Sequence, residues 1–285
     1  MPLILPALKK KGLSNLVIRS IAGFIFSVTV IGSAVLGKEA VALLFLFFAA
    51  VGLHEFYTIA GGTGQHKPRI AAGMILGFMV YALTYLHVQD LLDTKYLWLI
   101  GAWSTLMMVL ELYKLDQQAF ANLSFTVFGV FYVILPFAGV NLLAMYPGEF
   151  TCELPVGFFL ILWANDTGAY FVGRSIGRHK LYPEVSPNKT WEGLAGGVLM
   201  AMAAGFGLSQ LFDNVMDLQH WLVMGVIISI FGNLGDLFES HLKRTFGVKD
   251  SGQLIPGHGG VLDRFDGLLL SMPVVLAYLY FVRIF

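Results

Sequence analysis

The sequence predicts an all-α, polytopic integral membrane protein with about nine transmembrane helices and a cytoplasmic N-terminus. Three observations predict this fold class. First, 57% of the 285 residues are hydrophobic and the mean hydropathy is +0.74, above the roughly 45–50% apolar content of soluble domains. Second, apolar runs of about twenty residues, the length that crosses a bilayer core, recur along the whole chain. Third, lysine and arginine are distributed unevenly between the two sides of these runs.

The apolar runs are separated by charged or Gly/Pro-containing breaks. The first run is expected to remain a helix, because the lysines before it are not followed by a convincing signal-peptide cleavage site. No internal repeat or low-complexity linker is evident, so we expect one membrane domain over 1–285, with scaffold helices mainly in 1–155 and a motif-bearing catalytic half in 156–285. The expected spans are 17–36, 39–60, 69–88, 95–113, 120–146, 156–175, 192–212, 220–240 and 266–285.

The orientation follows from the positive charges in the loops, which collect on the cytoplasmic side of membrane proteins. With the N-terminus in the cytoplasm, only three of the 18 lysines and arginines fall on the far side, namely Lys38, Lys95 and Arg283. This asymmetry supports an odd number of spans. It also places the two polar loops, 174–192 and 241–266, in the cytoplasm.

The composition excludes several classes of protein. A net charge of zero argues against a broadly basic nucleic-acid binder. The single cysteine, Cys152, rules out an intrachain disulfide framework and a cysteine-rich metal site. There is no Walker sequence and no dinucleotide-binding glycine motif, so the soluble nucleotide-binding folds are excluded as well.

Within the first six apolar spans, three acids are candidates for a buried charge. Asp166 is nine residues before Arg174, about 13 Å along a helix, and a carboxylate at that depth suggests function. The alternative is a packing role for the polar cluster, through hydrogen bonds of its neighbours Asn165 and Thr167. Glu55 and Glu111 lie near the cytoplasmic ends of their spans, where a solvated position explains them equally well, and we assign them no function.

The loop from Ser186 to Gly193 is expected to be a turn that leads into a helix. Pro187 disfavours a helical residue before it, and Thr190 is suited to cap the helix that carries Glu192. Exposed amides at a helix start, beside Ser186 and Lys189, would suit a phosphate. The alternative is a basic loop that only obeys the orientation rule. Gly193 and Gly197, four residues apart, indicate a close contact between helices.

The stretch from Gly235 to Asp266 concentrates the charges of the chain. At helical spacing Asp236, Glu239 or Ser240, and Lys243 share one face. Asp263 and Asp266 share a face at the start of the last span, although capping alone could explain one of them. Oxygen ligands without clustered cysteine or histidine favour Mg²⁺ or Mn²⁺ over Zn²⁺.

Basic residues accompany these acids, as phosphoryl or nucleotidyl transfer requires. They neutralise charge on the attacked phosphate and on the leaving group. His258, in a glycine-rich turn, would bind a phosphate or act as a general acid, but a structural histidine explains it at least as well. The basic residues of this stretch are Lys243, Arg244, Lys249 and Arg264, and Asp250 is a further acid beside them.

Three motifs together identify a resemblance. The longest spans about 27 residues, from Ser240-His-Leu-Lys-Arg through Lys249-Asp-Ser-Gly and Leu254-Ile-Pro-Gly-His-Gly-Gly-Val-Leu to Asp263-Arg-Phe-Asp266. The others are Asp166-Thr-Gly-Ala-Tyr and Ser186-Pro-Asn-Lys-Thr-Trp-Glu-Gly. These residues resemble the phosphatidate cytidylyltransferases, the bacterial CDP-diacylglycerol synthases and their relatives. The resemblance covers roughly residues 160–270 by motif, and the first half only in hydropathy.

The resemblance implies an all-helical, metal-dependent enzyme of the bacterial inner membrane that condenses CTP with phosphatidate, in a polar cavity open to the cytoplasm. The products would be pyrophosphate and CDP-diacylglycerol for phospholipid synthesis. Membrane lipids are then partners and nucleic acid is not, while a homodimer and a monovalent cation beside Mg²⁺ are left open. By position, the metal ligands would be Asp236, Asp263 and Asp266; the catalytic residues Asp263, Asp236, Lys243 and Arg244; the phosphate-binding residues Ser186, Lys189, Ser240, Lys249, His258 and Arg264; and the further candidates Asp166, Glu239 and Asp250.

Two other functions compete with this one. A CTP-dependent lipid kinase, or a cytidylyltransferase for another lipid, would use similar residues. A transporter would use intramembrane carboxylates as an ion path, but the polar residues collect at the cytoplasmic side and no inverted halves are evident.

Overall fold

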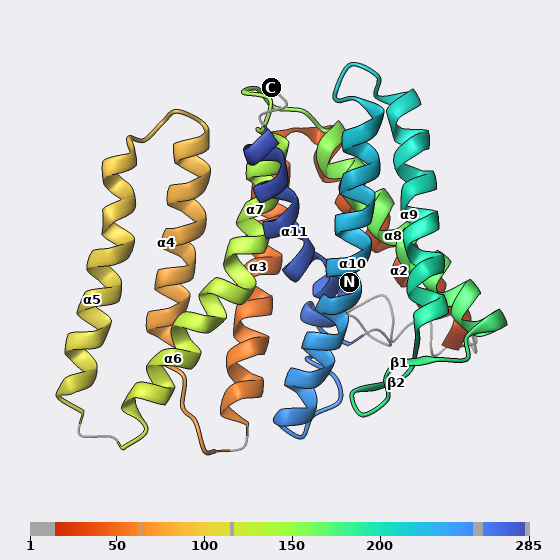
Figure 1. Ribbon diagram of the computed structural model, residues 1–285. Coiled ribbons are helices and arrows are strands. Elements are labelled where there is room, and N and C mark those ends of the chain that lie inside the picture. The colour runs from red at the N-terminus through yellow and green to blue at the C-terminus, as the bar shows by residue number, and fades with distance from the viewer. Residues whose placement is uncertain (1–14, 63, 115–116, 253–258, 283–285) are drawn as a thin grey trace. The chain divides into compact units, whose positions relative to one another are not determined.

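The protein is built mainly of helices (Figure 1). The computed structural model describes residues 15–62, 64–114, 117–252 and 259–282, and 78% of it is helical, in agreement with an all-α membrane protein. The elements in chain order are α2 (Asn15–Leu36), α3 (Lys38–Gly61), α4 (Ile70–Val88), the 3₁₀ turn η1 (Thr94–Leu97), α5 (Trp98–Leu112), α6 (Ala119–Gly129), the π-helical turn η2 (Val130–Ile134), α7 (Leu135–Ala144), α8 (Glu153–Ile176), β1 (Lys180–Tyr182), β2 (Ser186–Thr190), α9 (Trp191–Leu211), α10 (Leu218–Thr245) and α11 (Leu262–Val282).

Within the described residues, six helical segments are long and apolar enough to cross a membrane: α3, α4, the continuous run α6–η2–α7, α9, α10 and α11. The chain is therefore an integral membrane protein. The other three expected spans coincide with α2, α5 and α8. α5 has only 15 residues, and α8 contains Asn165, Asp166 and Arg174 in its second half. Nine spanning helices and a cytoplasmic N-terminus stay predictions.

The chain divides into two compact units. The first unit contains residues 1–141 and 245–265, and the second contains residues 142–244 and 266–285. The boundaries fall inside α7 and inside α11. Residues 245–265 of the C-terminal motif therefore belong to the same unit as the N-terminal helices. The expectation of a single domain stays a prediction.

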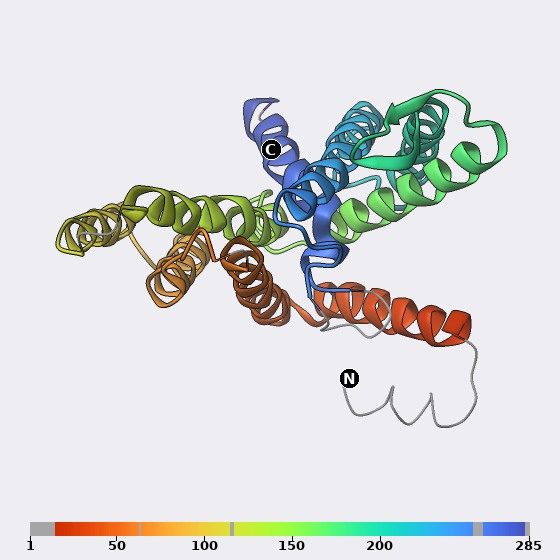
Figure 2. The same cartoon turned by 90° about the horizontal axis from the view of Figure 1, so that it is seen from below.

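The first unit has an aromatic core around Phe265, at the start of α11. The ring of Phe265 lies 4.9 Å from those of Phe48 and Phe137 and 5.3 Å from that of Phe26, measured between centroids. Its side chain is buried, and burial of an aromatic ring stabilises by roughly 1.5–3 kcal/mol. These contacts fix the N-terminal end of α11 against α2, α3 and α7. In the same unit, α4 lies beside α3 and α6 (Figure 2).

The second unit depends on close approach of helices at small residues. α8 and α9 run antiparallel, and a Cβ at Gly168 would lie 2.6 Å from the carbonyl oxygen of Gly196. A Cβ at Gly193 would lie 3.0 Å from the carbonyl oxygen of Ala169, and one at Gly197 would collide with Asn165. The close helix contact expected at Gly193 and Gly197 is confirmed.

The loop between α8 and α9 is a β-hairpin, where only a turn was expected. β1 and β2 pair antiparallel, with Lys180 opposite Thr190 and Tyr182 opposite Ser186. This hairpin is a local difference within a mostly helical chain, and the extended residue before Pro187 is part of strand β2. Thr190 caps α9 as expected, because its hydroxyl accepts a hydrogen bond from the amide of Gly193 at 3.1 Å. Figure 1 shows the hairpin at the start of α9.

Substitution of Gly235 by alanine should destabilise the second unit, whereas Gly207→Ala should not. A Cβ at Gly235 would collide with the carbonyl oxygen of Asp266, so α10 and α11 would have to separate, at a cost of about 1–3 kcal/mol. Gly207 lies in α9 with nothing near its Cβ position, and alanine there favours the helix by up to about 1 kcal/mol. Thermal unfolding of the purified variants in detergent measures both effects, and equal midpoints would contradict the close packing at Gly235.

Candidate functional site

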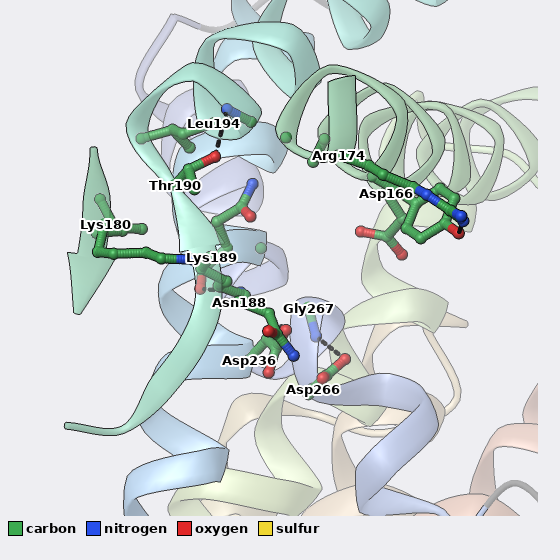
Figure 3. Close-up of a pocket in the computed structure, with 17 residues that line it drawn as sticks. Asp166, Arg174, Lys180, Asn188, Lys189, Thr190, Leu194, Asp236, Asp266 and Gly267 are labelled. Atoms are coloured by element: carbon green, nitrogen blue, oxygen red, sulfur yellow. Dashed lines mark hydrogen bonds and ion pairs between the residues drawn. The ribbon is translucent and has the colours of Figure 1, made fainter. Parts of the chain in front are cut away.

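A polar pocket lies in the second unit, with a volume of about 650 Å³. This size is within the usual range for small-molecule sites. Its wall comes from α8, the hairpin, the start of α9, α10 and α11 (Figure 3). The charged residues that line it are Asp166, Arg174, Lys180, Lys189, Asp236 and Asp266.

Three carboxylates from three different helices line this pocket. Asp166 projects from α8, Asp236 from α10 and Asp266 from α11. Asp166, Asp236 and Glu239 all lie within electrostatic range of Asp266. The Oδ1 atom of Asp266 accepts a hydrogen bond from the amide of Gly267 at 2.7 Å, which fixes the carboxylate relative to α11. The pocket therefore concentrates negative charge, which a bound cation would neutralise.

Lys189 brings a positive charge to these acids from the hairpin. Its Nζ atom lies 2.8 Å from Oδ2 of Asp236 and 3.0 Å from the carbonyl oxygen of Asn233, to which it donates a hydrogen bond. The β-strand conformation of Ser186–Thr190 turns alternate side chains to opposite faces, so Lys189 points toward α10 (Figure 3). Ser186, also expected to bind phosphate, lies on the same strand but does not line the pocket in the described structure.

A buried network of polar side chains lies next to the pocket and contacts Asp166. The side-chain oxygen of Asn165 accepts hydrogen bonds from the hydroxyl of Ser229 at 2.6 Å and from the side-chain amide of Asn233 at 3.2 Å. Asn165 donates in turn to Oδ1 of Asp166 at 3.1 Å. The packing role considered for Asn165 is thus present, and it also orients Asp166. The sequence analysis did not identify Ser229 and Asn233 as part of the site. Their polar side chains inside the apolar run 220–240 could have indicated a buried polar network.

Glu192 shapes the basic hairpin. Its carboxylate accepts hydrogen bonds from the backbone amides of Arg178 at 3.1 Å and His179 at 3.2 Å, and it lies 2.6 Å from Nδ1 of His179. Glu192 thereby connects the start of the hairpin to the first turn of α9.

Arg174, at the end of α8, donates a hydrogen bond to the hydroxyl of Tyr170 at 2.5 Å, and both residues line the pocket.

Four polar side chains near the C-terminal end of α10 form two separate pairs, one hydrogen-bonded and one ionic. Ser240 donates a hydrogen bond to Asp236 at 3.2 Å, and Lys243 forms a 2.8 Å ion pair with the buried Glu239. The expected shared face is present at i,i+4 spacing. Among the described residues, however, neither Ser240, Lys243 nor the exposed Arg244 lines the pocket. The pairing of Lys243 with Glu239 follows the i,i+4 spacing along α10, which places the two side chains one turn apart.

Asp263 has a different environment, in the first unit. Its Oδ2 atom accepts hydrogen bonds from the amide and hydroxyl of Ser251, at 2.9 and 2.8 Å, and from the amide of Gly260 at 2.8 Å. The nearby candidates differ in exposure: Lys249 and Asp250 are exposed, and Arg264 is half-buried. His258 lies outside the described residues.

The side chains of the pocket can be compared with the ligands that a divalent cation requires. In the part of the chain that the structure describes, no three His, Cys, Asp or Glu side chains form a ready metal-binding cluster. Mg²⁺ does not need one, since it commonly takes one or two carboxylates and completes its shell with substrate phosphates and water. Asp236 and Asp266 supply two carboxylates at one pocket. The residues present therefore fit Mg²⁺ in donor type and charge.

Comparison with known proteins relates this chain to a family of nucleotidyltransferases. Residues 17–282 match the family described as the cytidylyltransferase family. A phosphatidate cytidylyltransferase from Staphylococcus epidermidis is 36% identical over 234 residues, covering 72% of this chain and 90% of the relative. The phosphatidate cytidylyltransferase of Bacillus subtilis is 50% identical over 127 residues, 43% of this chain and 44% of the relative. That of Staphylococcus aureus is 50% identical over 119 residues, 41% of this chain and 45% of the relative.

Proposed function

Since the chain belongs to the cytidylyltransferase family, we propose that it transfers CMP from CTP to phosphatidate, giving CDP-diacylglycerol and pyrophosphate. The observation that carries this proposal is the pocket of the second unit, where three carboxylates and three basic side chains meet. Both charge types are needed to bind a metal–nucleotide and a phosphomonoester together.

The reaction is an in-line displacement. A phosphate oxygen of phosphatidate attacks the α-phosphorus of CTP, a new P–O bond forms, and the bond from the α-phosphorus to the bridging oxygen breaks as pyrophosphate leaves. Lys189, Lys180 and Arg174 bind phosphate oxygens and neutralise the charge that develops on them. Holding both substrates in one pocket converts a meeting of a soluble and a membrane-bound molecule into an oriented encounter.

Asp236 and Asp266 would hold a divalent cation, Mg²⁺ or Mn²⁺, with Asp166 as a further acid of the same pocket. When bound, the cation supplies charge neutralisation on the phosphates of CTP. Lys189 keeps Asp236 oriented through their ion pair, while Asn165 orients Asp166. The role of Asp263 at the reaction centre, which the family resemblance suggests, stays a prediction.

The pocket faces the cytoplasm of a bacterial cell in this proposal, with the enzyme in the inner membrane. The support is the distribution of lysine and arginine and the location of CTP. Phosphatidate would reach the pocket from the bilayer.

The product distribution tests the proposal. Purified enzyme is incubated with phosphatidate micelles, Mg²⁺ and CTP labelled at either the α- or the γ-phosphate. Label from the α-position should enter the lipid, and label from the γ-position should appear in pyrophosphate. A lipid kinase would instead put the γ-label into the lipid and release CDP. Absence of both labels from the lipid would contradict any transfer to phosphatidate, and CTP-independent solute uptake in proteoliposomes would favour a transporter.

Removal of divalent cations should stop the reaction. Excess EDTA is expected to abolish CDP-lipid formation, because the acids of the pocket would then repel the phosphates of CTP, and added Mg²⁺ should restore it. The measurement is the rate of pyrophosphate release. Full activity in EDTA, with the metal content verified, would contradict the assignment of a divalent cation.

A further inference from the structure

Glu55 is a buried carboxylate near the C-terminal end of a largely apolar helix. It belongs to α3, its residue is only 7% exposed, and in the described part of the chain it forms no ion pair. A buried carboxylate without a cation is costly, and an apolar side chain usually serves stability better at such a position. Stability alone is therefore a poor account of Glu55.

The partners of Glu55 come from the C-terminal motif, about two hundred residues later. Its Oε2 atom accepts hydrogen bonds from the amide of Leu262 at 3.1 Å and from the hydroxyl of Ser251 at 3.2 Å. The first of these contacts caps the N-terminus of α11, where a negative charge is favourable. Both contacts lie within the first unit.

Ser251 links Glu55 to Asp263. Its hydroxyl lies 3.2 Å from Oε2 of Glu55 and 2.8 Å from Oδ2 of Asp263. A hydroxyl has one proton to donate, so the two carboxylates share a single donor. Any shift of Glu55 therefore changes the hydrogen bonding of the Asp263 carboxylate.

Three glycines of the C-terminal motif lie next to the carboxylates of Glu55 and Asp263. A Cβ added to Gly252 or Gly260 would collide with the carboxylate of Glu55, and one added to Gly259 would collide with that of Asp263. Gly259 also has a φ of 79°, which favours glycine. Gly252, Gly259 and Gly260 therefore pack closely against these two carboxylates, where a larger residue would not fit.

We propose that Glu55 is a positioning residue for Asp263: it holds Ser251 and the start of α11 so that the Asp263 carboxylate keeps one orientation. This inference rests on the proposed function, because that function gives Asp263 its expected part in the reaction. It assigns the positioning of Asp263 to an N-terminal helix that the sequence indicated only as scaffold. Groups of this kind orient the residues that they contact, and their loss reduces turnover more than binding.

The test compares Glu55→Ala and Glu55→Gln with Glu111→Gln in the purified full-length protein. Glu111 is a matched control, since it is also a buried carboxylate of the first unit but pairs with Arg69 and Lys114. Two readouts are used: the rate of tryptic cleavage after the exposed Lys249, and kcat and KM for CTP.

Glu55→Ala should speed cleavage after Lys249 and lower kcat, each by about tenfold, the effect of losing one or two hydrogen bonds. KM for CTP should change by less than about threefold, on the same grounds. Glu55→Gln should recover most of both properties, because the amide oxygen still accepts from Leu262 and Ser251. Glu111→Gln should match the wild type in kcat and cleavage.

Ser251→Ala keeps the inference testable if Glu55→Ala does not fold. It should lower kcat like Glu55→Ala, because it removes the hydroxyl that links Glu55 to Asp263. Wild-type cleavage and kcat in Glu55→Ala, or wild-type kcat in Ser251→Ala, would overturn the inference. A wild-type enzyme that makes no CDP-lipid would instead contradict the proposed function, while the cleavage rates would still test the anchoring.

Discussion

Replacement of Asp266 by asparagine should lower kcat by about a thousandfold, equivalent to ~4 kcal/mol of transition-state stabilisation. Asparagine has nearly the same shape, and its side-chain oxygen can still accept the 2.7 Å hydrogen bond from the amide of Gly267. Only the negative charge is lost from the pocket. We therefore expect a folded protein with a higher Mg²⁺ requirement, measured as the Mg²⁺ concentration that gives half-maximal CDP-lipid formation.

The matched control is Asp213→Asn. Asp213 is exposed in the loop between α9 and α10 and does not line the pocket. It should retain the kcat and the Mg²⁺ dependence of the wild type. If Asp266→Asn has the same Mg²⁺ dependence as the wild type and a kcat within about threefold of it, well short of the loss expected for a metal ligand, the assignment of Asp266 to a cation site is wrong.

The helices could be predicted from the sequence because their signal is strong and local. Apolar runs of bilayer length, ended by charges or by Gly and Pro, mark every helix from α2 to α11 to within a few residues of an expected span. The cap at Thr190 and the close approach at Gly193 and Gly197 also follow from local rules. The hairpin was missed because two strands of three and five residues carry too little periodicity to be distinguished from a turn.

The sequence could indicate candidate residues, but not how the fold groups them. Helical spacing determines which residues of α10 share a face, but it says nothing about what other elements bring to that face. Asp236 receives Lys189 from the hairpin, a contact that no spacing along α10 indicates. Asp263 and Asp266 are one turn apart on α11, yet the unit boundary falls between them and their partners differ.

Some residues could not be recognised from the sequence because their partners are far away along the chain. Glu55 was set aside because solvation near the end of a span explained it, and nothing local indicated that its partner is Ser251, 196 residues away. Asn233 and Ser229 are one turn apart within an apolar helix, but their shared partner Asn165 lies on another helix. Such polar networks inside a membrane protein are set by tertiary packing, which a single sequence does not encode at any fixed spacing.

Lys189→Met should lower kcat/KM for CTP by about a hundredfold. The ammonium group is the cation nearest to Asp236 in the described pocket, at 2.8 Å, and a phosphate contact of this type contributes several kcal/mol to the transition state. Stability should change little, since Asp236 is 40% exposed and ion pairs at such positions contribute only about 0–1 kcal/mol. Lys180→Met, at an exposed residue of the same pocket, should have a smaller effect.

A double-mutant cycle separates two accounts of Lys189. If its main task is to orient Asp236, the losses caused by Lys189→Met and Asp236→Asn should not add, because either change already breaks the pair. If it mainly binds a phosphate of CTP, the losses should add, and KM for CTP should rise in Lys189→Met alone. The second hydrogen bond of Lys189, to the carbonyl oxygen of Asn233 at 3.0 Å, holds the ammonium group at the pocket wall without any substrate. This contact does not depend on Asp236 and leaves the ammonium group placed to bind a phosphate, so it favours the additive result; a non-additive one would make the orientation of Asp236 the larger share.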